Sequence, residues 1–153
     1  MTDTIITLID AIADDLRVNA AGIGLPQQYN EIRYSKPLLE NVSQCPLLAI
    51  YPFGSEPSNF TTDGQFIVPD TLVVGWFEAV PDSMDTGTID NSIAQASLAR
   101  AGSLNKHIRG YYSTIPNVPF QTNVSFGRVR YGRVRGGILG VEIHVIVTTW
   151  QGT

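Results

Sequence analysis

The alternation of hydrophobic and polar residues is most regular near the C-terminal end of the chain, from Val124 to Trp150. Two β-type runs flank Gly136-Gly137 in this segment. In the second run, valine or isoleucine occupies every second position from Val141 to Val147, which gives a strand one apolar face. A Gly-Gly pair permits the positive φ angles of a two-residue turn. The pattern therefore predicts a long C-terminal β-hairpin.

Two other segments have the periodicity of amphipathic helices. From Thr4 to Val18 the apolar residues follow an i, i+3, i+4, i+7, i+11 spacing, and Asn19 and Gly22 stand where a helix would stop. A second helix is predicted from Ser92 to about Tyr111. The expected inner stripe of this second helix consists of Ile93, Ser97, Ala101, Leu104, Ile108 and Tyr111.

The remaining segments predict strands and connections. Pro46 to Pro52 and Phe66 to Val80 are typical of strands, and the Gly-, Ser-, Pro- and Thr-rich segment Phe53 to Gln65 predicts a mobile loop between them. Gly22 to Val42 is irregular, either a short strand pair or an extended arm. The 153 residues suit one domain, residues 1–153. The order predicts an α+β fold: an antiparallel or mixed sheet of about four to five strands, two helices packed on one face, and a long C-terminal hairpin.

Composition narrows the function classes. Charged residues make up 16% of the chain, against about 25% in typical soluble domains, and such chains often hide part of their surface against partners. The net charge of −4 gives no general affinity for nucleic acid or acidic membranes. We see neither a signal-peptide pattern nor an apolar run of membrane-spanning length, and the single Cys45 forms no internal disulfide. We expect a soluble cytoplasmic protein or an assembly subunit.

Positive charge is concentrated on the first arm of the hairpin. Four of the ten lysines and arginines lie there: Arg128, Arg130, Arg133 and Arg135. We call these four residues the arginine arm. The first two differ in parity from the last two, which predicts a bulge at Gly132. Such density in a charge-poor chain favours an interaction surface, whereas an isolated run of this kind is often only a solvated strand face.

No pattern of catalytic residues stands out. The chain lacks a phosphate-binding glycine loop, a Gly-x-Ser-x-Gly elbow, His-Glu-x-x-His and Cys-x-x-Cys. Glu142 and His144 share a strand face, so an acid–base or metal pair is geometrically possible, but such pairs are far more often surface contacts. Cys45 is interpreted as a small buried hydrophobe. We therefore predict no catalytic residue, no metal, no cofactor and no enzymatic activity.

The complete layout resembles that of the tail terminator proteins of long-tailed bacteriophages. The similarity covers nearly the whole chain: an N-terminal amphipathic helix, Asp3 to Val18; a strand, Leu47 to Tyr51; a long polar loop; a strand, Thr71 to Val80; a helix, Ser92 to Tyr111; and a closing strand pair that ends at Thr148. It is a likeness of layout and local texture, without a short diagnostic motif. Other small neck proteins of the same virions are similar, though less closely.

The resemblance implies a structural protein of the virion, assembled in the host cytoplasm. Such proteins form a homo-oligomeric ring, usually of six subunits, that caps the tail tube, ends its polymerisation and joins the tail to the head connector. Expected partners are the tail tube protein and an adaptor or head-closure protein; DNA passes through the lumen without specific recognition, and no membrane is involved. A ring also needs two complementary patches, which the arginine arm and the acidic first helix (Asp10, Asp14 and Asp15) are expected to supply.

Three alternatives remain at this point. The chain is another neck component, a head-closure or adaptor protein; or a nucleic-acid-binding module that uses the arginine arm with Phe126 and Tyr131 as a stacking platform; or a small enzyme that uses Glu142 and His144.

Overall fold

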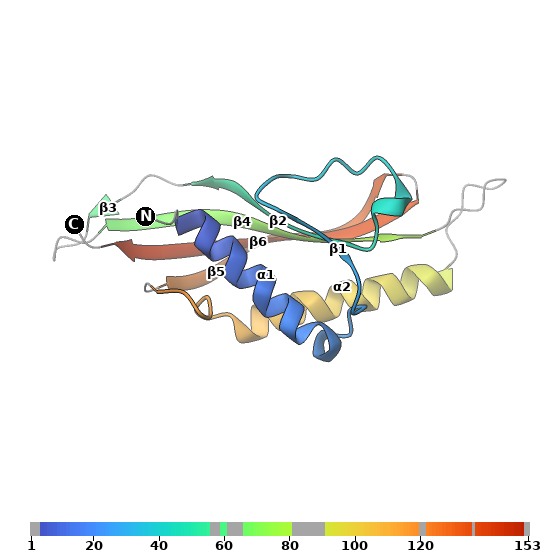
Figure 1. The fold of residues 1–153 in the computed structure, drawn as a ribbon, viewed down its shortest axis with the longest axis horizontal. Helices are drawn as coiled ribbons and strands as arrows, with labels where there is room; N and C mark the ends of the chain where they lie inside the picture. The colour runs from blue at the N-terminus through green and yellow to red at the C-terminus, as the bar shows by residue number, and fades with distance from the viewer. Residues whose placement is uncertain are drawn as a thin grey trace.

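A computed structural model of the chain describes residues 4–55, 59–60, 66–80, 91–119, 122–135 and 137–151. The α+β class predicted from the sequence is confirmed (Figure 1). In chain order the elements are α1 (Thr4–Ile23), β1 (Asn30–Arg33), the 3-10 helix η1 (Val42–Gln44), β2 (Leu47–Ser55), β3 (Asn59–Phe60), β4 (Phe66–Ala79), α2 (Asn91–Tyr111), β5 (Thr122–Arg135) and β6 (Ile138–Gln151).

The sheet is mixed and has the order β1-β2-β4-β6-β5, with β3 paired to β4 beside this path. β1 runs parallel to β2, and the other pairs are antiparallel. β4 and β6 pair without interruption from Phe66↔Gln151 to Ala79↔Ile138. β5 and β6 form the predicted hairpin, in which Gly137 has a φ of +78° at the turn. The two long central strands therefore form the spine of the sheet.

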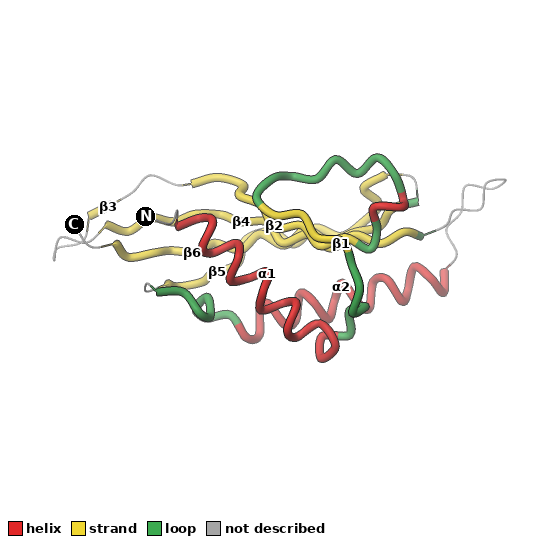
Figure 2. The backbone as a smooth tube through the Cα atoms, in the orientation of Figure 1, coloured by secondary structure: helices red, strands yellow, loops and turns green. Residues whose placement is uncertain are grey.

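Both helices cover the same face of the sheet, as predicted (Figure 2). Alternate residues of β6 from Val141 to Val147 are fully buried under them. α1 contributes Leu8, Ile12 and Leu16 to this core, and α2 contributes Leu104 and Ile108. We call this side of the sheet the helix face and the opposite side the outer face.

α1 is longer than the sequence indicated, so the predicted end near Val18 is wrong. Asn19 lies inside the helix, where its side-chain amide donates to the Asp15 carbonyl oxygen at 2.8 Å. The helix stops at Gly24, which has a φ of +94°. The Leu25 amide donates to the Ala20 carbonyl at 2.9 Å and the Gly24 amide to Ala21 at 3.2 Å. These two bonds are the Schellman pattern, which satisfies the last carbonyls of a helix.

α2 has nearly the predicted bounds, but its inner stripe differs at both ends. Ile93 is 37% exposed and Tyr111 is 77% exposed, whereas Tyr112, the residue after the helix, is buried. Ser97, Ala101, Leu104 and Ile108 are buried as expected. The buried aromatic side chain at the end of the helix is therefore Tyr112, since the chain leaves helical geometry there and turns Tyr112 inward.

The segment Gly22 to Val42 contains the short strand β1 and then an arm that folds over the outer face. This arm, residues 34–46, covers a second and smaller core. Leu39 and Cys45 of the arm pack against it. The buried members of this core are Leu47, Ala49, Tyr51, Val73, Phe77 and Ile138. Of the predicted loop Phe53 to Gln65, Phe53–Ser55 continues β2 and Asn59–Phe60 forms β3; the rest, and its predicted mobility, lies outside the described residues.

The bulge predicted at Gly132 is not there. Gly132 pairs in register with Gly140, and the register shifts lie between Phe126 and Val129 and between Arg133 and Arg135. Phe126 and Val129 both pack on the helix-face core. Residues three apart share a strand face only if the strand contains an extra residue, so burial of both side chains places the bulge at the intervening positions.

Two glycines make room for the ring of Phe77 on the outer face. A Cβ atom on Gly75 would lie 2.8 Å from the Phe77 ring, and one on Gly140 would overlap that ring and lie 3.0 Å from the Trp76 carbonyl oxygen. The ring of Phe77 thus lies flat across strands β4 and β6. Gly102, inside α2, has no such neighbours.

We predict that Gly140→Ala lowers the free energy of unfolding by about 1–3 kcal/mol, because the added methyl overpacks the Phe77 ring. The same methyl in Gly102→Ala is expected to raise it by about 0.5–1 kcal/mol, since it meets no atom and restricts the unfolded chain. Urea titration of both variants measures these changes. Equal effects of the two substitutions would mean that the Phe77 ring does not lie over Gly140.

Candidate interaction surface

The structure places half of the arginine arm in detail. Arg128 and Arg130 are exposed on β5, the edge strand of the sheet. Arg130 is the cross-strand partner of Glu142 and lies on the outer face. Arg133 and Arg135 belong to the same strand, but their side chains lie outside the described part of the structure.

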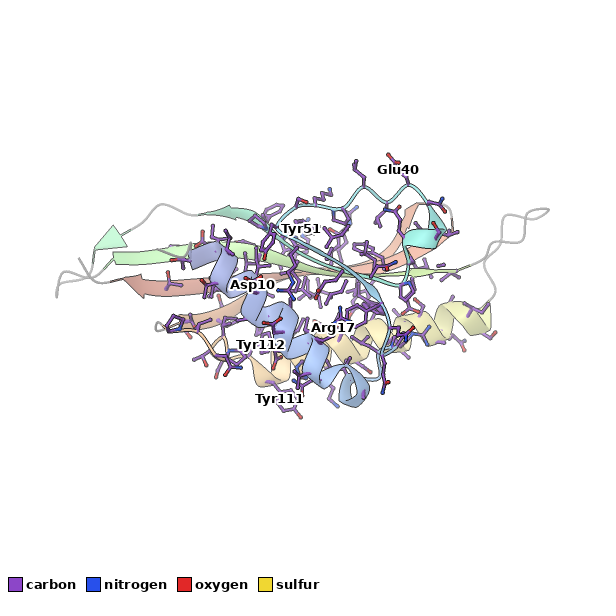
Figure 3. The ribbon with its side chains drawn as sticks, in the orientation of Figure 1. Asp10, Arg17, Glu40, Tyr51, Tyr111 and Tyr112 are labelled. Atoms are coloured by element: carbon purple, nitrogen blue, oxygen red, sulfur yellow. The ribbon has the colours of Figure 1, made fainter. Side chains whose placement is uncertain are left out.

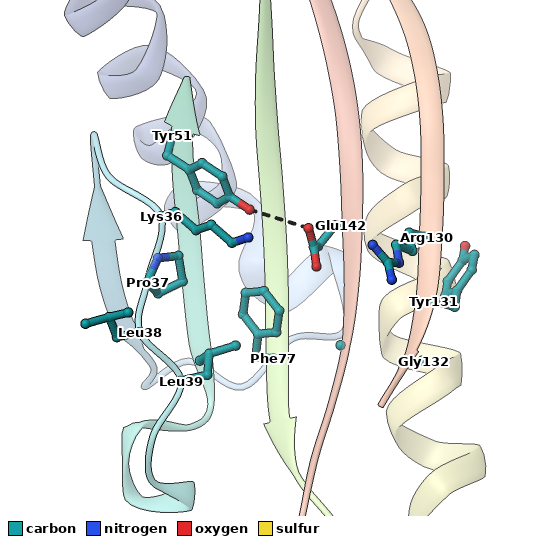
Figure 4. A pocket seen from close by; sticks show the side chains of 11 residues that line it. Lys36, Pro37, Leu38, Leu39, Tyr51, Phe77, Arg130, Tyr131, Gly132 and Glu142 are labelled. Atoms are coloured by element: carbon teal, nitrogen blue, oxygen red, sulfur yellow. Dashed lines mark hydrogen bonds between the residues drawn. The ribbon is translucent and has the colours of Figure 1, made fainter. Parts of the chain in front are cut away.

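Arg130 forms one wall of a groove of about 620 Å³ on the outer face (Figure 4). The opposite wall is the arm of residues 34–46, with Lys36 and Leu39. The floor consists of Phe77, Tyr51 and Glu142. The groove therefore joins strands and an arm that are distant in the sequence, and it combines apolar surface with two cations and one carboxylate.

Tyr51 and Glu142 interact at the centre of the groove. The Tyr51 hydroxyl donates to Glu142 Oε2 at the long distance of 3.5 Å. Burial, followed by the negative charge of Glu142, raises the pKa of Tyr51 to about 12, so the hydroxyl stays protonated at neutral pH. This geometry fixes a polar contact in the floor of the groove and contains no activated nucleophile.

The basic residues in and beside the groove lack the ion pairs that Arg33 and Arg100 make. Arg33 binds Asp10, Asp14 and Glu31, and Arg100 binds Glu78. By contrast, Lys36, Arg128 and Arg130 have no ion pair with any described residue. Unpaired cations this close together are tolerated in water or opposite the acidic groups of a partner.

The carboxylates on α1 bind other residues of the same subunit. They are therefore not a free acidic patch that could complement the arginine arm of a neighbouring copy, as the sequence suggested. Arg33 Nη1 donates to Asp10 at 2.9 Å, and the Tyr34 hydroxyl donates to it at 2.6 Å (Figure 3 shows Asp10 on α1). The Tyr34 bond, then Arg33, lowers the pKa of Asp10 despite partial desolvation. Asp14 binds Arg33 as well. Asp10 and Asp14 therefore attach α1 to Arg33 in β1 and to Tyr34, which follows β1.

Asp15 joins the two helices instead. It accepts from the Tyr112 hydroxyl at 2.5 Å and lies 3.3 Å from His107 Nε2. Burial and the Asp15 bond raise the pKa of Tyr112 well above its usual range. The cluster borders an open hollow of about 730 Å³ that Lys106 and Tyr111 also line. Its side chains satisfy one another, and we interpret it as a lock between α1 and α2.

The stacking platform expected for a nucleic-acid module is not present as one surface. Phe126 is half-buried on the helix-face core, with the Arg109 guanidinium 5.6 Å from its ring centre. The Tyr131 hydroxyl accepts from Asn105 of α2 at 3.1 Å, on the helix face. Arg130, however, lies in the groove on the outer face. Phe126 and Arg130 thus occupy opposite faces of β5, whereas Tyr131 borders both the groove and the helix face.

Glu142 and His144 share the outer face as predicted, but each has a different neighbour. The His144 ring contacts Phe53 at 4.8 Å between centroids, whereas Glu142 contacts Tyr51. Cys45 is half-buried, and burial raises the pKa of its thiol, which disfavours the thiolate. Among the described residues no cluster of three His, Cys, Asp or Glu side chains could hold a metal ion.

A second hollow, of about 210 Å³, lies on the helix face next to the edge strand, between α2 and the hairpin. Its lining is almost entirely apolar and includes Trp76, Leu98 and Tyr131. Leu98 is 57% exposed and Tyr131 44% exposed. Sequence reasoning missed this hollow because it treated the α2 stripe as core along its whole length; the small side chains Ala94, Ser97 and Ala101 were the available signal.

Comparison with known proteins adds no family. The sequence matches no protein-family model, and no curated protein is significantly similar to it. None of the described helices is long and apolar enough to span a membrane. The function must therefore be argued from the surface itself.

We predict that Tyr112→Phe lowers the free energy of unfolding at pH 8 by about 1–3 kcal/mol, because it removes a hydrogen bond to a carboxylate. A tyrosine whose folded-state pKa is raised contributes stability that is present below pH ~10 and is lost as the pH rises above it. The difference between wild type and variant should therefore shrink between pH 10 and pH 11 in urea titrations. Tyr111→Phe, at the exposed neighbouring position, is the control and should change the free energy of unfolding little. If the difference between wild type and Tyr112→Phe stayed constant up to pH 11, the Tyr112–Asp15 hydrogen bond would not be the source of the stability.

Proposed function

We propose that this chain is a ring-forming structural protein of a bacteriophage neck, a tail terminator that caps the tail tube, ends its polymerisation and joins the tail to the head connector. In this proposal six copies form the ring, DNA passes through the lumen without base recognition, and the tail tube protein and an adaptor or head-closure protein bind the two ends. The chain acts by assembly and carries no catalytic residue.

The observation that carries the proposal is the unpaired positive charge at the outer-face groove. Lys36 and Arg130 line it without an ion pair among the described residues, and Tyr131, 44% exposed, also lines it. Charged side chains beside apolar surface are typical of interfaces that bury an apolar centre within a polar rim. Arginine suits such contacts because its planar guanidinium binds carboxylates with two parallel hydrogen bonds.

Two further features support assembly. The layout of two helices on one face and a long C-terminal hairpin agrees with the resemblance on which the phage assignment rests. A ring subunit also buries surface on two sides, which suits a chain with only 16% charged residues. A head-closure or adaptor ring would use the same surface. Only a terminator caps tail tubes, so an assay of tube capping distinguishes it from the other two rings.

A nucleic-acid-binding module remains the second candidate, because Arg128 and Arg130 are exposed. The separation of Phe126 from Arg130 by the thickness of the sheet weakens it, since stacking and backbone contacts would need one continuous surface. The net charge of −4 weakens it further.

We predict that Arg130→Glu combined with Arg133→Glu leaves the subunit folded but weakens ring assembly or tube capping by about 2–5 kcal/mol, the cost of removing one side of a paired interface contact. Circular dichroism checks the fold, size-exclusion chromatography checks assembly, and electron micrographs give the length of tail tubes grown with and without the protein.

The matched control is Lys106→Glu, which reverses a charge beside the α1–α2 hollow. It should assemble and cap normally. If the arginine double variant also assembles and caps normally but no longer binds DNA, the arginine arm faces nucleic acid and the proposal that it forms a protein interface is wrong. If wild-type protein forms rings that do not limit tube length, the chain belongs to another ring of the neck.

A further inference from the structure

The turn at residues 38–42 lies at the surface and is closed by side-chain hydrogen bonds. The Gln44 side chain accepts from the amides of Glu40 at 2.8 Å and Asn41 at 2.9 Å, and it donates to the Leu38 carbonyl at 2.9 Å. Asn41 caps η1 by accepting from the Ser43 amide at 3.0 Å. One glutamine side chain thus closes the turn through bonds within the subunit.

This turn presents three exposed side chains, those of Leu38, Glu40 and Val42. Leu38 is 76% exposed and Val42 47% exposed, while Leu39 between them packs inward on the outer-face core. Glu40 is exposed and makes no ion pair with any described residue. Figure 3 shows Glu40 pointing away from the molecule. The turn therefore displays an apolar, an acidic and an apolar side chain at alternate positions.

The β5 edge of the sheet presents the complementary features. β5 is the last strand on that side, and beside it lies the apolar hollow lined by Leu98 and Tyr131. Arg130 precedes Tyr131 on this strand and lacks an ion pair among described residues. In Figure 4, Leu38 points outward on the β1 side of the sheet, and Arg130 and Tyr131 lie on the β5 side. Leu38 and Arg130 thus stand at opposite walls of the outer-face groove.

We infer that the turn at residues 38–42 of one copy docks on the β5 edge of the next copy, with Leu38 in the hollow and Glu40 against Arg130. This rests on the proposed ring function and names its lateral contact. Two different patches of one subunit make a head-to-tail interface, which closes into a ring when the rotation allows it.

The size and charge of the two patches favour a second copy over other occupants. The hollow of about 210 Å³ is smaller than the roughly 300–1,000 Å³ of small-molecule sites, and it suits an inserted side chain. The carboxylate of the turn matches the unpaired guanidinium of the edge. The turn is already ordered by Gln44, so docking costs little conformational entropy.

The test uses two charge reversals, Glu40→Arg and Arg130→Glu, in the full chain. Analytical ultracentrifugation gives the concentration at which half of each protein is assembled. Each single variant places like charges at every contact, and we expect this concentration to rise about tenfold or more. The protein carrying both reversals restores an opposite pair and should assemble within about threefold of wild type.

Mixing the two single variants is the sharper arm of the experiment. The reversed turn of a Glu40→Arg copy matches the reversed edge of an Arg130→Glu copy. The natural turn of the Arg130→Glu copy, which keeps Glu40, matches the natural edge of the Glu40→Arg copy, which keeps Arg130. When the two variants alternate around the ring, the reversed pair and the natural pair alternate as well. An even-numbered ring such as a hexamer then has an opposite charge pair at every contact. At a concentration at which neither variant assembles alone, we expect the equimolar mixture to assemble.

The outcomes separate the two proposals. Assembly of both single variants at the wild-type concentration overturns the turn-to-edge contact and leaves the ring intact. Loss of assembly that neither the double reversal nor the mixture restores also overturns it. A wild type that remains monomeric at every concentration and does not cap tubes overturns the proposed function itself, together with this contact.

Discussion

The fold depends on the uninterrupted pairing of β4 with β6. This ladder runs from Phe66↔Gln151 to Ala79↔Ile138 and joins two of the longest strands at the centre of the sheet. Its register sets which side chains face the helices, because a shift by one residue would exchange the two faces. With this register the alternate residues Val141 to Val147 are buried under α1 and α2, and Glu142 and His144 lie on the outer face.

The same constraint leaves the two faces unequally covered. The helix face is closed by two helices over most of its length (Figure 2), while the outer face is covered only by the arm of residues 34–46 among the described segments. Phe77 lies flat over Gly75 and Gly140 and fills the remaining apolar space. Beyond it, Lys36 and Arg130 line an open groove. Partial cover by a short arm thus concentrates unpaired charge where a partner could neutralise it.

Local patterns predicted most of the fold. The alternation from Val141 to Val147, the glycine pair at 136–137 and the two helical stripes are signals within single elements, and the structure confirms these elements. The end of α1 was missed because Asn19 bonds within its own helix and Gly24 supplies the stop. The bulge was misplaced because it depends on burial of Phe126 and Val129 under helices elsewhere in the sequence.

The candidate site was less predictable. The sequence identified the arginine arm by its density, but the groove needs Lys36 and Tyr51, and the Tyr51–Glu142 contact joins residues 91 positions apart. The acidic face of α1 was expected to be available, yet Arg33 occupies Asp10 and Asp14. Such long-range pairing leaves no local periodicity to recognise. Which charges remain unpaired is therefore a property of the fold.

The central claim is that the β5 edge and the turn at residues 38–42 are buried between copies of this chain. Hydrogen–deuterium exchange, measured by mass spectrometry on dilute monomer and on assembled protein, tests it most directly. The account predicts that assembly slows exchange of the amides at residues 38–42 and 129–132 and leaves residues 106–112, around the α1–α2 lock, unchanged. Slower exchange at residues 106–112, with no change at the turn and the β5 edge, would contradict it.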